Sequence, residues 1–408
     1  MRIVLTADTF PPKCGGSGWS AFEQARALIS RGHAITVIRP GTGGETSYQG
    51  IKILQCPIHR SGIPVFRHLV GRELFHERFR AFVEQTLSAN RPDLIHAQHA
   101  VTGPPTIEAA ASGGVPSIVT VRDYWPVCLW GTKMRGALRC PGCSYGRIVR
   151  CLSANSPATI PISPLAAIYI SSYLQRLRRH LLRADAVIAI SDRIRSELIS
   201  FLPEDKVQVI HNFIELSSIA EGYRPPASEP YITFAGKFTV VKGILELLEA
   251  LRRAHVEIPV VFIGDGPLRQ KIADEISSGR IKGRITGWLD RDQMISTIAG
   301  GQFNLFASRW DEPLGRVLIE AAAVGRTSVI LAAPKSGPWE ILEDGRSGLF
   351  ATDVDQFMKA IRRLVGDPAL AARMGEAART RMTAQFSADA VIPQMEACYE
   401  TASLKGRS

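Results

Sequence analysis

Residues 303–322 read Phe-Asn-Leu-Phe-Ala-Ser-Arg-Trp-Asp-Glu-Pro-Leu-Gly-Arg-Val-Leu-Ile-Glu-Ala-Ala. The apolar run Phe303–Phe306 has the composition of a buried strand, and a turn with Pro313 and Gly315 separates it from a segment of helical periodicity. We expect the helix to start just after Glu312, because proline is favoured in the first turn. A strand, a loop and a helix in this order form the unit from which helix-covered parallel sheets are built.

The same alternation of apolar runs and helical segments extends along the chain in both directions. In the first half, strands are predicted at Ile3–Thr6, Ala34–Ile38, Leu94–His96, Ser117–Val121, Ala186–Ile190 and Val207–Ile210. In the second half, they are predicted at Tyr231–Ala235, Val260–Gly264, Ile285–Thr286, Phe303–Phe306 and Ser328–Leu331. The expected fold class is therefore α/β, with two Rossmann-like, doubly wound parallel-sheet domains that face a ligand-binding cleft.

The proline-rich segment Gly222–Pro230 is typical of a linker between the two series of strands. We expect an amino-terminal domain over residues 1–220 and a second domain over residues 221–386. The helical segment at residues 387–408 follows the second series, and we expect it to cross back to the first domain.

The charge of the chain is unevenly distributed. Of 408 residues, 45% are apolar, which is enough to bury the cores of about two domains and excludes a disordered protein. Residues 1–220 hold 25 Lys and Arg against 15 Asp and Glu, whereas residues 221–408 hold 24 against 23. The excess in the first half indicates an anionic partner there: a nucleic acid, a membrane surface or a phosphorylated substrate.

The sequence also bears on location. No apolar secretory signal follows Met1, so we expect a cytoplasmic protein. The longest run without charge, Cys151–Gln175, is interrupted by Pro157 and Pro161, and we expect no transmembrane helix. Seven cysteines in such a protein are expected to be reduced thiols or metal ligands.

A glycine-rich loop follows the first predicted strand. Gly16-Ser-Gly18-Trp-Ser-Ala21 fits the G-x-G-x-x-A fingerprint of dinucleotide-binding domains. A nicotinamide cofactor is not expected, because the loop from Thr6 to Gly15 is too long for the tight turn of that fingerprint. Gly15 and Gly16 remain candidates for ligand binding, since the backbone can approach a phosphate closely at glycine.

Polar residues follow two strands of the second half. After Tyr231–Ala235, the turn carries Gly236 and the ammonium groups of Lys237 and Lys242, which suit a diphosphate. Gly264 ends the next strand and lets a base or ribose approach the backbone. Taken singly, each turn is equally compatible with an ordinary solvated strand-to-helix connection.

Two acids flank the helix start in residues 303–322. Glu312 precedes the helix and can reach sugar hydroxyls, and Glu320 lies where a carboxylate can accept two vicinal ribose hydroxyls. The amides of the first turn form a candidate anion site at Gly315, Arg316, Val317 and Leu318. A capped amphipathic helix with two surface acids is the plain alternative, but it does not explain why acids and lysines alike follow strand ends.

At these residues the chain resembles the retaining glycosyltransferases of family 4, which have the GT-B fold. Glu312-x7-Glu320 is similar to the E-x7-E motif of that family, and Lys237 with Lys242 resembles its basic pair. The resemblance covers nearly the whole chain and includes Gly15-Gly16, Arg31–Val37, Pro92–His96, Ala186–Ser191, Asn212, Gly345–Gly348 and the carboxy-terminal helix.

The resemblance implies roles for these residues. Glu320 would bind the nucleotide ribose, Glu312 the donor sugar, and Lys237 and Lys242 the departing diphosphate. Fixed cations and helix amides stabilise such a leaving group without a metal, so we expect no catalytic metal or cofactor. The family retains the anomeric configuration by front-face attack, and the resemblance therefore implies no protein nucleophile. The candidate catalytic residues are Glu312, Lys242 and Arg122, and the candidate donor-binding residues are Gly15, Gly16, Gly236, Lys237, Lys242, Gly264, Glu312, Gly315, Arg316, Val317, Leu318 and Glu320.

The chain departs from the family pattern at two positions. Lys237 stands where the family more often has Arg, which keeps the charge but loses the bidentate fork. Arg122 stands where the family commonly has a histidine near the reacting sugar, and arginine is no general base at neutral pH. We expect Arg122 to hold a phosphate of the donor or acceptor. The motifs Asp290-Arg-Asp292 and Asp353-Val-Asp355 resemble a metal-binding D-x-D sequence, but we interpret both as helix caps.

The first half carries the candidate features of acceptor binding. Cys128, Cys140, Cys143 and Cys151 are either ligands of a structural zinc ion or unligated thiols. Two basic and aromatic stretches, Leu165–Arg183 and Arg67–Arg80, either lie on an anionic membrane leaflet or pack on their own sheet. Nucleic acid is not expected, because no recognition motif accompanies the charge.

The expected activity is transfer of a sugar, with retention, from a UDP- or GDP-sugar to a hydroxyl of a glycan or lipid-linked acceptor. Such an enzyme would serve in cell-surface polysaccharide or glycolipid synthesis, without a membrane span but peripheral to the inner leaflet. Two alternatives stay open: a nucleotide-sugar epimerase or hydrolase of the same fold, and a non-catalytic protein that binds a sugar nucleotide.

Overall fold

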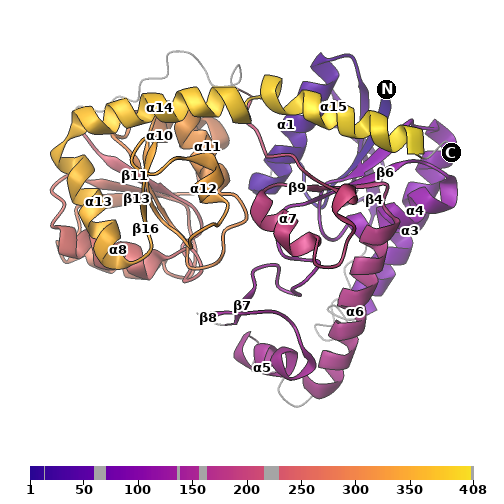
Figure 1. The fold of residues 1–408 in the computed structure, drawn as a ribbon, viewed down its shortest axis with the longest axis horizontal. Helices are drawn as coiled ribbons and strands as arrows, with labels where there is room; N and C mark the ends of the chain where they lie inside the picture. Colours follow the sequence, from indigo (N-terminus) through magenta and orange to yellow (C-terminus); the bar gives the residue numbers. More distant parts are fainter. Residues whose placement is uncertain (13, 59–69, 136–137, 156–162, 216–228, 406–408) are drawn as a thin grey trace. The chain divides into compact units, whose positions relative to one another are not determined.

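The computed structural model describes the chain except for residues 13, 59–69, 136–137, 156–162, 216–228 and 406–408. Most of the predicted linker Gly222–Pro230 lies outside the described residues. The chain forms two compact units, each with its own sheet (Figure 1). Unit 1 contains Met1–Gly131, Gly142–Phe213 and Val391–Ser408, and unit 2 contains Thr132–Pro141 and Ile214–Ala390.

Unit 1 is built on an eight-stranded sheet with the strand order β10-β9-β6-β5-β1-β2-β4-β3. The strands are β1 (Arg2–Thr6), β2 (Ala34–Gly41), β3 (Glu45–Tyr48), β4 (Ile51–Pro57), β5 (Leu94–Ala97), β6 (Ser117–Val121), β9 (Ala186–Ala189) and β10 (Val207–Val209). All neighbours are parallel except β3 and β4. The strands β5, β6 and β9 are buried along their whole length, which explains their nearly continuous apolar sequences.

Helices connect the strands of unit 1. They are α1 (Gly16–Ser30), α3 (Val70–Asn90), α4 (Gly103–Gly113), α5 (Tyr145–Asn155), α6 (Ser163–Arg183) and α7 (Asp192–Leu198). Helix α4 starts with Pro104 and Pro105 in its first turn and ends at Gly114 in the left-handed conformation, with φ of 61°. Phe79 and Leu87 of α3 are buried in a core cluster with Ala109 of α4.

Unit 2 is built on a six-stranded, fully parallel sheet with the order β13-β12-β11-β14-β15-β16. Its strands are β11 (Ile232–Ala235), β12 (Val260–Ile263), β13 (Gly283–Gly287), β14 (Asn304–Ala307), β15 (Ser328–Leu331) and β16 (Gly348–Ala351). From β11 the chain first builds β12 and β13 on one side and then returns to build β14 on the other. The order therefore reverses between β11 and β14, which is where doubly wound folds bind ligands.

The helices of unit 2 are α8 (Ile244–Ala254), α9 (Arg269–Ser277), α10 (Arg291–Gly300), α11 (Arg316–Ala323), α12 (Pro338–Ile341), α13 (Val354–Gly366) and α14 (Pro368–Phe386). Phe234, Phe262 and Phe303 from the sheet region form the core with Leu247 of α8 and Phe357 of α13. Every strand predicted from the sequence is present in the two sheets, so the α/β class is confirmed.

Two segments belong to a different unit from the residues that precede them in the chain. The hairpin of β7 (Met134–Arg135) and β8 (Leu138–Arg139) belongs to unit 2, where Arg139 Nε donates to the carbonyl oxygen of Arg309 at 3.0 Å. The last helix, α15 (Ala388–Lys405), belongs to unit 1 from Val391 onward.

Helix α15 is held on unit 1 by a buried polar cluster. The Tyr399 hydroxyl is 2.8 Å from His96 Nδ1 and accepts a hydrogen bond of 2.7 Å from Gln24 Nε2. His96 Nε2 lies 2.7 Å from Thr120 Oγ1 on β6. Burial, assisted by the nearby charge of Arg122, lowers the pKa of His96 to about 3, so its ring is neutral.

Candidate functional site

The predicted donor-binding residues of unit 2 gather at the carboxyl ends of its strands. Lys237 and Lys242 follow β11, Gly264 follows β12, and Glu312 lies between β14 and α11. Since β11 and β14 are neighbours on either side of the strand-order reversal, the two loops that follow them start side by side. A backbone hydrogen bond of 2.9 Å from the Arg309 amide to the Val241 carbonyl joins these loops directly.

Glycines bring the loops after β11 and β12 into backbone contact. A Cβ atom at Gly264, whose φ is 134°, would lie 2.0 Å from the carbonyl oxygen of Gly236. The Gly236 amide donates to the Ile263 carbonyl at 3.0 Å, and the Phe238 amide donates to that of Asp265 at 2.9 Å. Gly264 is thus required by packing between loops, and together with Gly236 it leaves this stretch of backbone without side chains.

Lys242 and Glu312 form an ion pair. Lys242 Nζ is 2.7 Å from Glu312 Oε2, and the Lys242 ammonium lies 5.1 Å from the ring centre of Trp310. The side chain of Lys242 is 30% exposed, and Lys237 is an exposed residue of the same loop. Both candidate cations of the diphosphate site are therefore open to a ligand, and Glu312 fixes the ammonium group of Lys242 in place.

Glu312 is the buried centre of this site. The residue is 6% exposed, and its Oε2 atom also accepts hydrogen bonds from Trp310 Nε1 at 2.5 Å and Ser308 Oγ at 3.2 Å. Sequence reasoning gave no role to Trp310 or Ser308, although both immediately precede the motif. Their side chains orient the carboxylate. The spacing of the motif does not reveal these hydrogen bonds, because it does not show which way a side chain points.

Helix α11 begins later than the sequence predicts. It starts at Arg316 rather than just after Glu312, because Gly315 adopts a left-handed conformation with φ of 97° that interrupts helical geometry. The Leu318 amide donates to the Gly315 carbonyl at 2.9 Å, and the Leu318 side chain is fully buried. Of the predicted anion site, the amide of Leu318 is thus already paired, while Gly315, Arg316 and Val317 form the turn that precedes it.

Arg316 and Glu320 form the second ion pair of unit 2. Arg316 Nε is 2.9 Å from Glu320 Oε1, four residues along α11, and the side chains are 13% and 8% exposed. The structure therefore joins the candidate residues of unit 2 as two ion pairs, Lys242 with Glu312 and Arg316 with Glu320. Glu320 is partly shielded and held in position by Arg316, as a carboxylate that orders ribose hydroxyls needs to be.

The candidate residues of unit 1 lie in two places. Gly15 and Gly16 are located at the start of α1, and a Cβ atom at Gly15 would meet nothing within 4 Å. Arg122 follows β6, where its Nε donates to the Gln98 carbonyl at 3.1 Å and its Nη2 to Gln98 Oε1 at 2.6 Å. A further hydrogen bond joins Arg122 Nη1 to Asn212 Oδ1. In these three contacts the guanidinium donates to neutral oxygens.

The two D-x-D sequences are helix caps, as predicted. Asp290 accepts a hydrogen bond from the Gln293 amide at 2.8 Å and forms a capping box at the start of α10. Asp353 accepts one from the Gln356 amide at 2.8 Å at the start of α13. Both interpretations as caps are confirmed.

The four clustered cysteines fall in different parts of the fold. Cys128, Cys143 and Cys151 belong to unit 1, and Cys140 belongs to unit 2. Among the residues that the structure describes, His76, Glu108 and His180 form the one group of three or more His, Cys, Asp or Glu side chains with the spacing of metal ligands, and it contains no cysteine.

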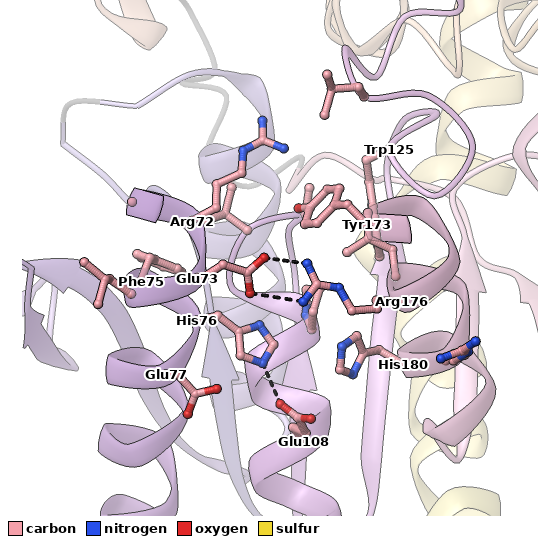
Figure 2. Close-up of a pocket in the computed structure, with 18 of the residues that line it drawn as sticks. Arg72, Glu73, Phe75, His76, Glu77, Glu108, Trp125, Tyr173, Arg176 and His180 are labelled. Carbon is pink, nitrogen blue, oxygen red and sulfur yellow. Dashed lines mark hydrogen bonds and ion pairs between the residues drawn. The ribbon is translucent and has the colours of Figure 1, made fainter. Parts of the chain in front are cut away.

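Unit 1 also contains a pocket of about 680 Å³ that sequence reasoning missed. Figure 2 shows its lining by side chains of α3 and α6, with Glu108 of α4 and Trp125 of the loop after β6. Asp123, at the start of that loop, also lines the pocket, and burial raises its pKa to about 6. The volume is that of a small-molecule site. No signal in the sequence pairs these elements, since they are far apart along the chain.

The two basic and aromatic stretches form α3 and α6, whose side chains contact each other, while Arg67 lies outside the described residues. Glu73 accepts hydrogen bonds from Tyr169 at 2.8 Å and from Arg176 at 2.5 and 3.2 Å. Burial opposes the ionisation of Glu73, but these hydrogen bonds outweigh it and lower the pKa. Arg72 stacks over Tyr173 at 5.2 Å. Much of the basic and aromatic surface therefore serves contacts inside unit 1.

Some apolar side chains of these helices remain exposed. Leu165 is 73% and Ile168 is 59% exposed on α6, and Leu74 is 52% exposed on α3. In the part of the chain that the structure describes, no helix has the length and apolar character needed to cross a membrane.

Known proteins resemble this chain along nearly its whole length. It is 24% identical to the glycogen synthase of Mycobacterium tuberculosis (strain ATCC 25618 / H37Rv), in a match that covers 95% of this chain and 91% of that protein. It is also 24% identical to the alpha-maltose-1-phosphate synthase of Mycolicibacterium smegmatis, over 78% of this chain and 81% of that protein.

Solved structures share the fold. A sucrose-phosphate synthase from Thermosynechococcus elongatus superposes with a TM-score of 0.72 at 20% identity and covers all of both chains. Anabaena Alr3699/HepE in complex with UDP-glucose has a TM-score of 0.70 at 16% identity, over 98% of this chain and all of that one. Residues 14–218 match Glycosyltransferase Family 4, and residues 218–381 match Glycosyl transferases group 1. The chain therefore belongs to the group 1 glycosyltransferases of the GT-B fold, with an amino-terminal half of glycosyltransferase family 4.

Proposed function

We propose that this glycosyltransferase moves a hexosyl group, with retention and without a metal ion, from a nucleoside diphosphate sugar to a hydroxyl of a glycan or lipid-linked acceptor. The observation that carries the proposal is the pair of ion pairs in unit 2, Lys242 with Glu312 and Arg316 with Glu320. They place two cations and two carboxylates at the carboxyl ends of the strands, where the order of the sheet reverses.

Each part of a sugar nucleotide has a complementary group here. Lys237 and Lys242 supply positive charge for the diphosphate, whose negative charge grows as the glycosyl bond breaks. Glu320 supplies an anionic acceptor for the two ribose hydroxyls, and Glu312 faces the hydroxyls of the sugar. The bare backbone between Gly236 and Gly264 admits the nucleotide without a side-chain clash.

The ion pair of Lys242 has a consequence for the mechanism. Without donor, the ammonium is shared between the Glu312 carboxylate and the Trp310 ring. When a diphosphate enters, Lys242 donates to its oxygens, and Glu312 then accepts from a sugar hydroxyl instead. Ion-pair exchange of this kind keeps the buried carboxylate satisfied before and after binding, so little desolvation has to be overcome during the reaction.

Similar proteins favour one nucleotide and one class of acceptor. Structures of Anabaena Alr3699/HepE hold UDP and UDP-glucose, which favours UDP over GDP. Relatives that are named glycogen synthase and alpha-maltose-1-phosphate synthase favour a carbohydrate acceptor. The pocket of unit 1, with Arg72 and Arg179 in its lining, has room and charge for a phosphorylated or lipid-linked sugar of a cell-surface polysaccharide or glycolipid.

One comparison tests the proposal. The protein is incubated with UDP- and GDP-sugars, with and without glycans or membrane lipid extract, and release of nucleoside diphosphate is measured. Release that depends on acceptor supports transfer, and the anomeric proton signal of the product in NMR reports retention. Release without acceptor would indicate a hydrolase or epimerase, and binding without release would indicate a non-catalytic binding protein.

Attachment to the inner leaflet is tested separately. The exposed Leu165 and Ile168 of α6 lie on a helix that also carries Arg178 and Arg179. Flotation with anionic liposomes is expected to recover the protein at low salt and to lose it as ionic strength rises. Absence from the floating fraction at low salt contradicts membrane attachment but leaves glycosyl transfer untouched.

A further inference from the structure

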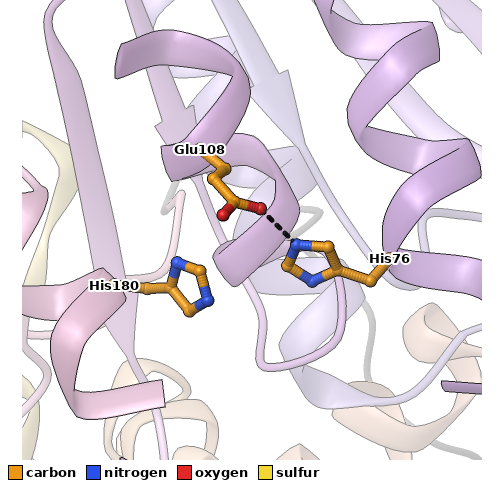
Figure 3. Close-up of side chains that lie close together, drawn as sticks. All are labelled: His76, Glu108 and His180. Carbon is orange, nitrogen blue, oxygen red and sulfur yellow. Dashed lines mark hydrogen bonds and ion pairs between the residues drawn. The ribbon is translucent and has the colours of Figure 1, made fainter. Parts of the chain in front are cut away.

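Three helices of unit 1 bring potential metal ligands together at one end of its pocket. His76 comes from α3, Glu108 from α4 and His180 from α6, and one ligand atom from each lies within 4.8 Å of the other two. Figure 3 shows the three side chains converging on one point. All three residues also line the pocket of about 680 Å³.

The cluster leaves a polar atom unsatisfied. His76 Nε2 is 2.5 Å from Glu108 Oε2, and this contact accounts for one carboxylate oxygen and one ring. His180 Nδ1 is shielded from solvent and has no hydrogen-bond partner among the residues that the structure describes. A buried ring nitrogen without a hydrogen-bond partner is unfavourable, so a site that holds one calls for a ligand. A plain ion pair of His76 with Glu108 does not account for this nitrogen.

The arginines near the cluster do not prevent a cation from binding, because acidic side chains pair with them. Arg176 is engaged by Glu73, and Arg80 by Glu77 and Glu84. Arg183 lies 4.0 Å from Glu108 Oε1, but its side chain is 61% exposed and its charge is screened by water.

We propose that His76, Glu108 and His180 bind a divalent transition-metal ion, with Zn²⁺ as the expected ion. Two imidazoles and one carboxylate are a ligand set that zinc favours in sites that retain an open position. Hard cations such as Mg²⁺ and Ca²⁺ are disfavoured, because they take oxygen ligands. Binding needs His76 and Glu108 to separate slightly, since a shared ion replaces their direct hydrogen bond.

The ion would have two effects on unit 1. It joins α3, α4 and α6, which are distant in sequence, so it stabilises the walls of the pocket. With three protein ligands, it also keeps a coordination position for an oxygen atom of a pocket ligand. The site lies in a different unit from Lys242 and Glu320, and the proposal does not depend on the donor chemistry.

Zinc binding to the full-length apo protein tests this proposal directly. Competition with a chromophoric chelator is expected to reveal one tight site, and the thermal midpoint is expected to rise with added Zn²⁺. His180→Ala and His76→Ala are expected to weaken this site by about 100-fold or more, since even partners outside the ligand shell are worth about 10- to 100-fold. His255→Asn, an exposed histidine of unit 2 in a left-handed position that Asn tolerates, is the matched control.

Two further measurements separate zinc binding by this cluster from a loss of folding and from zinc binding by cysteines. Glu108→Gln keeps a hydrogen-bonding group for His76 but removes the anionic ligand, so it is expected to fold normally and lose tight zinc binding. Co²⁺ bound in place of Zn²⁺ is expected to show ligand-field bands without a thiolate-to-cobalt charge-transfer band, because no cysteine belongs to the cluster.

The proposal is overturned by several outcomes. Wild-type protein without a tight zinc site, equal affinity in His180→Ala and the control, or a thiolate spectrum for Co²⁺ would each contradict it. Circular dichroism of every variant shows whether the fold is retained. UDP binding, measured alongside, is expected to be unchanged in all these variants, so a failure here is distinguishable from a failure of the proposed glycosyl transfer.

Discussion

Replacing Glu320 with glutamine tests the assignment of the nucleotide-binding site most directly. Glutamine has nearly the same shape as glutamate and keeps one oxygen that can accept from Arg316 Nε, now at 2.9 Å from Glu320 Oε1. What the substitution removes is the negative charge and one of two acceptor oxygens. The variant therefore probes the proposed contact with the two ribose hydroxyls rather than the packing of α11.

The expected loss follows from the burial of the carboxylate. The Glu320 side chain is 8% exposed, so water does little to weaken its hydrogen bonds. A hydrogen bond to a charged group contributes about 1.5–3 kcal/mol, and a neutral one about half as much. Losing one charged bond and half the strength of the other costs about 2.3–4.5 kcal/mol, which corresponds to a dissociation constant for UDP raised by about 40- to 2,000-fold.

Isothermal titration calorimetry with UDP measures this change without knowledge of the sugar or the acceptor. Uridine without phosphates is titrated in parallel, because the ribose contact is expected to affect both ligands equally. Glu376→Gln is the matched control, since Glu376 is exposed on α14 of the same unit. The thermal midpoint of each variant shows whether α11 remains folded once Arg316 has lost its charged partner.

One result would refute the reasoning. If Glu320→Gln binds UDP within about threefold of the wild-type and control proteins while its thermal midpoint is unchanged, Glu320 does not contact the ribose. The pair with Arg316 would then be a structural contact within α11.

Three further predictions concern charge, pH and backbone packing. Lys242→Ala is expected to weaken UDP binding in calorimetry by about 10-fold or more, because one charged hydrogen bond is lost. The exposed Lys271→Ala is the control, and equal UDP affinity of the two variants would contradict the diphosphate assignment. The pKa of His96 is about 3 in the folded protein and about 6.5 in the unfolded chain, so protein stability falls as the pH drops below 6.5, by about 2 kcal/mol at pH 5. In urea unfolding, His96→Gln should lose correspondingly less stability between pH 7 and pH 5 than the wild type. An equal loss of stability in both proteins would count against this histidine. Gly264→Ala should prevent unit 2 from folding, because the added Cβ would lie 2.0 Å from the Gly236 carbonyl oxygen. Gly279→Ala is the control and should fold, since a Cβ at Gly279 would meet nothing within 4 Å. A Gly264→Ala protein with the wild-type thermal midpoint would refute the loop contact.

Local patterns of the sequence predict most of the sheets. Strands such as Ser117–Val121 and Ser328–Leu331 are found with the predicted bounds, because both faces of a central parallel strand are buried and the run must be apolar throughout. The edge strand β3, its neighbour β4 and the last strand β16 were not predicted. In β3 the residues Glu45–Tyr48 are mostly exposed, so no apolar run marks them.

The motifs were found from the sequence, but their partners were not. Spacing places Glu312 and Glu320 on either side of a helix start, and it places Lys242 in the loop after β11. Which cation meets which acid depends on how β11 and β14 pair, and this pairing joins residues 70 positions apart. The role of Trp310 depends on the same pairing, because its indole lies against Lys242 only when both loops are in place.

The sequence by itself determined the α/β class, the order of strands and helices, and the chemical groups at the strand ends, because each is a local consequence of hydrophobic period and turn residues. Only the tertiary structure decided the ion pair of Lys242 with Glu312 and the cluster of His76, Glu108 and His180. Those contacts join side chains from separate turns or elements, and the packing of whole helices and strands sets their distances. The pocket of unit 1 exists for the same reason, since it is lined by helices α3 and α6, which 72 residues of the sequence (91–162) separate.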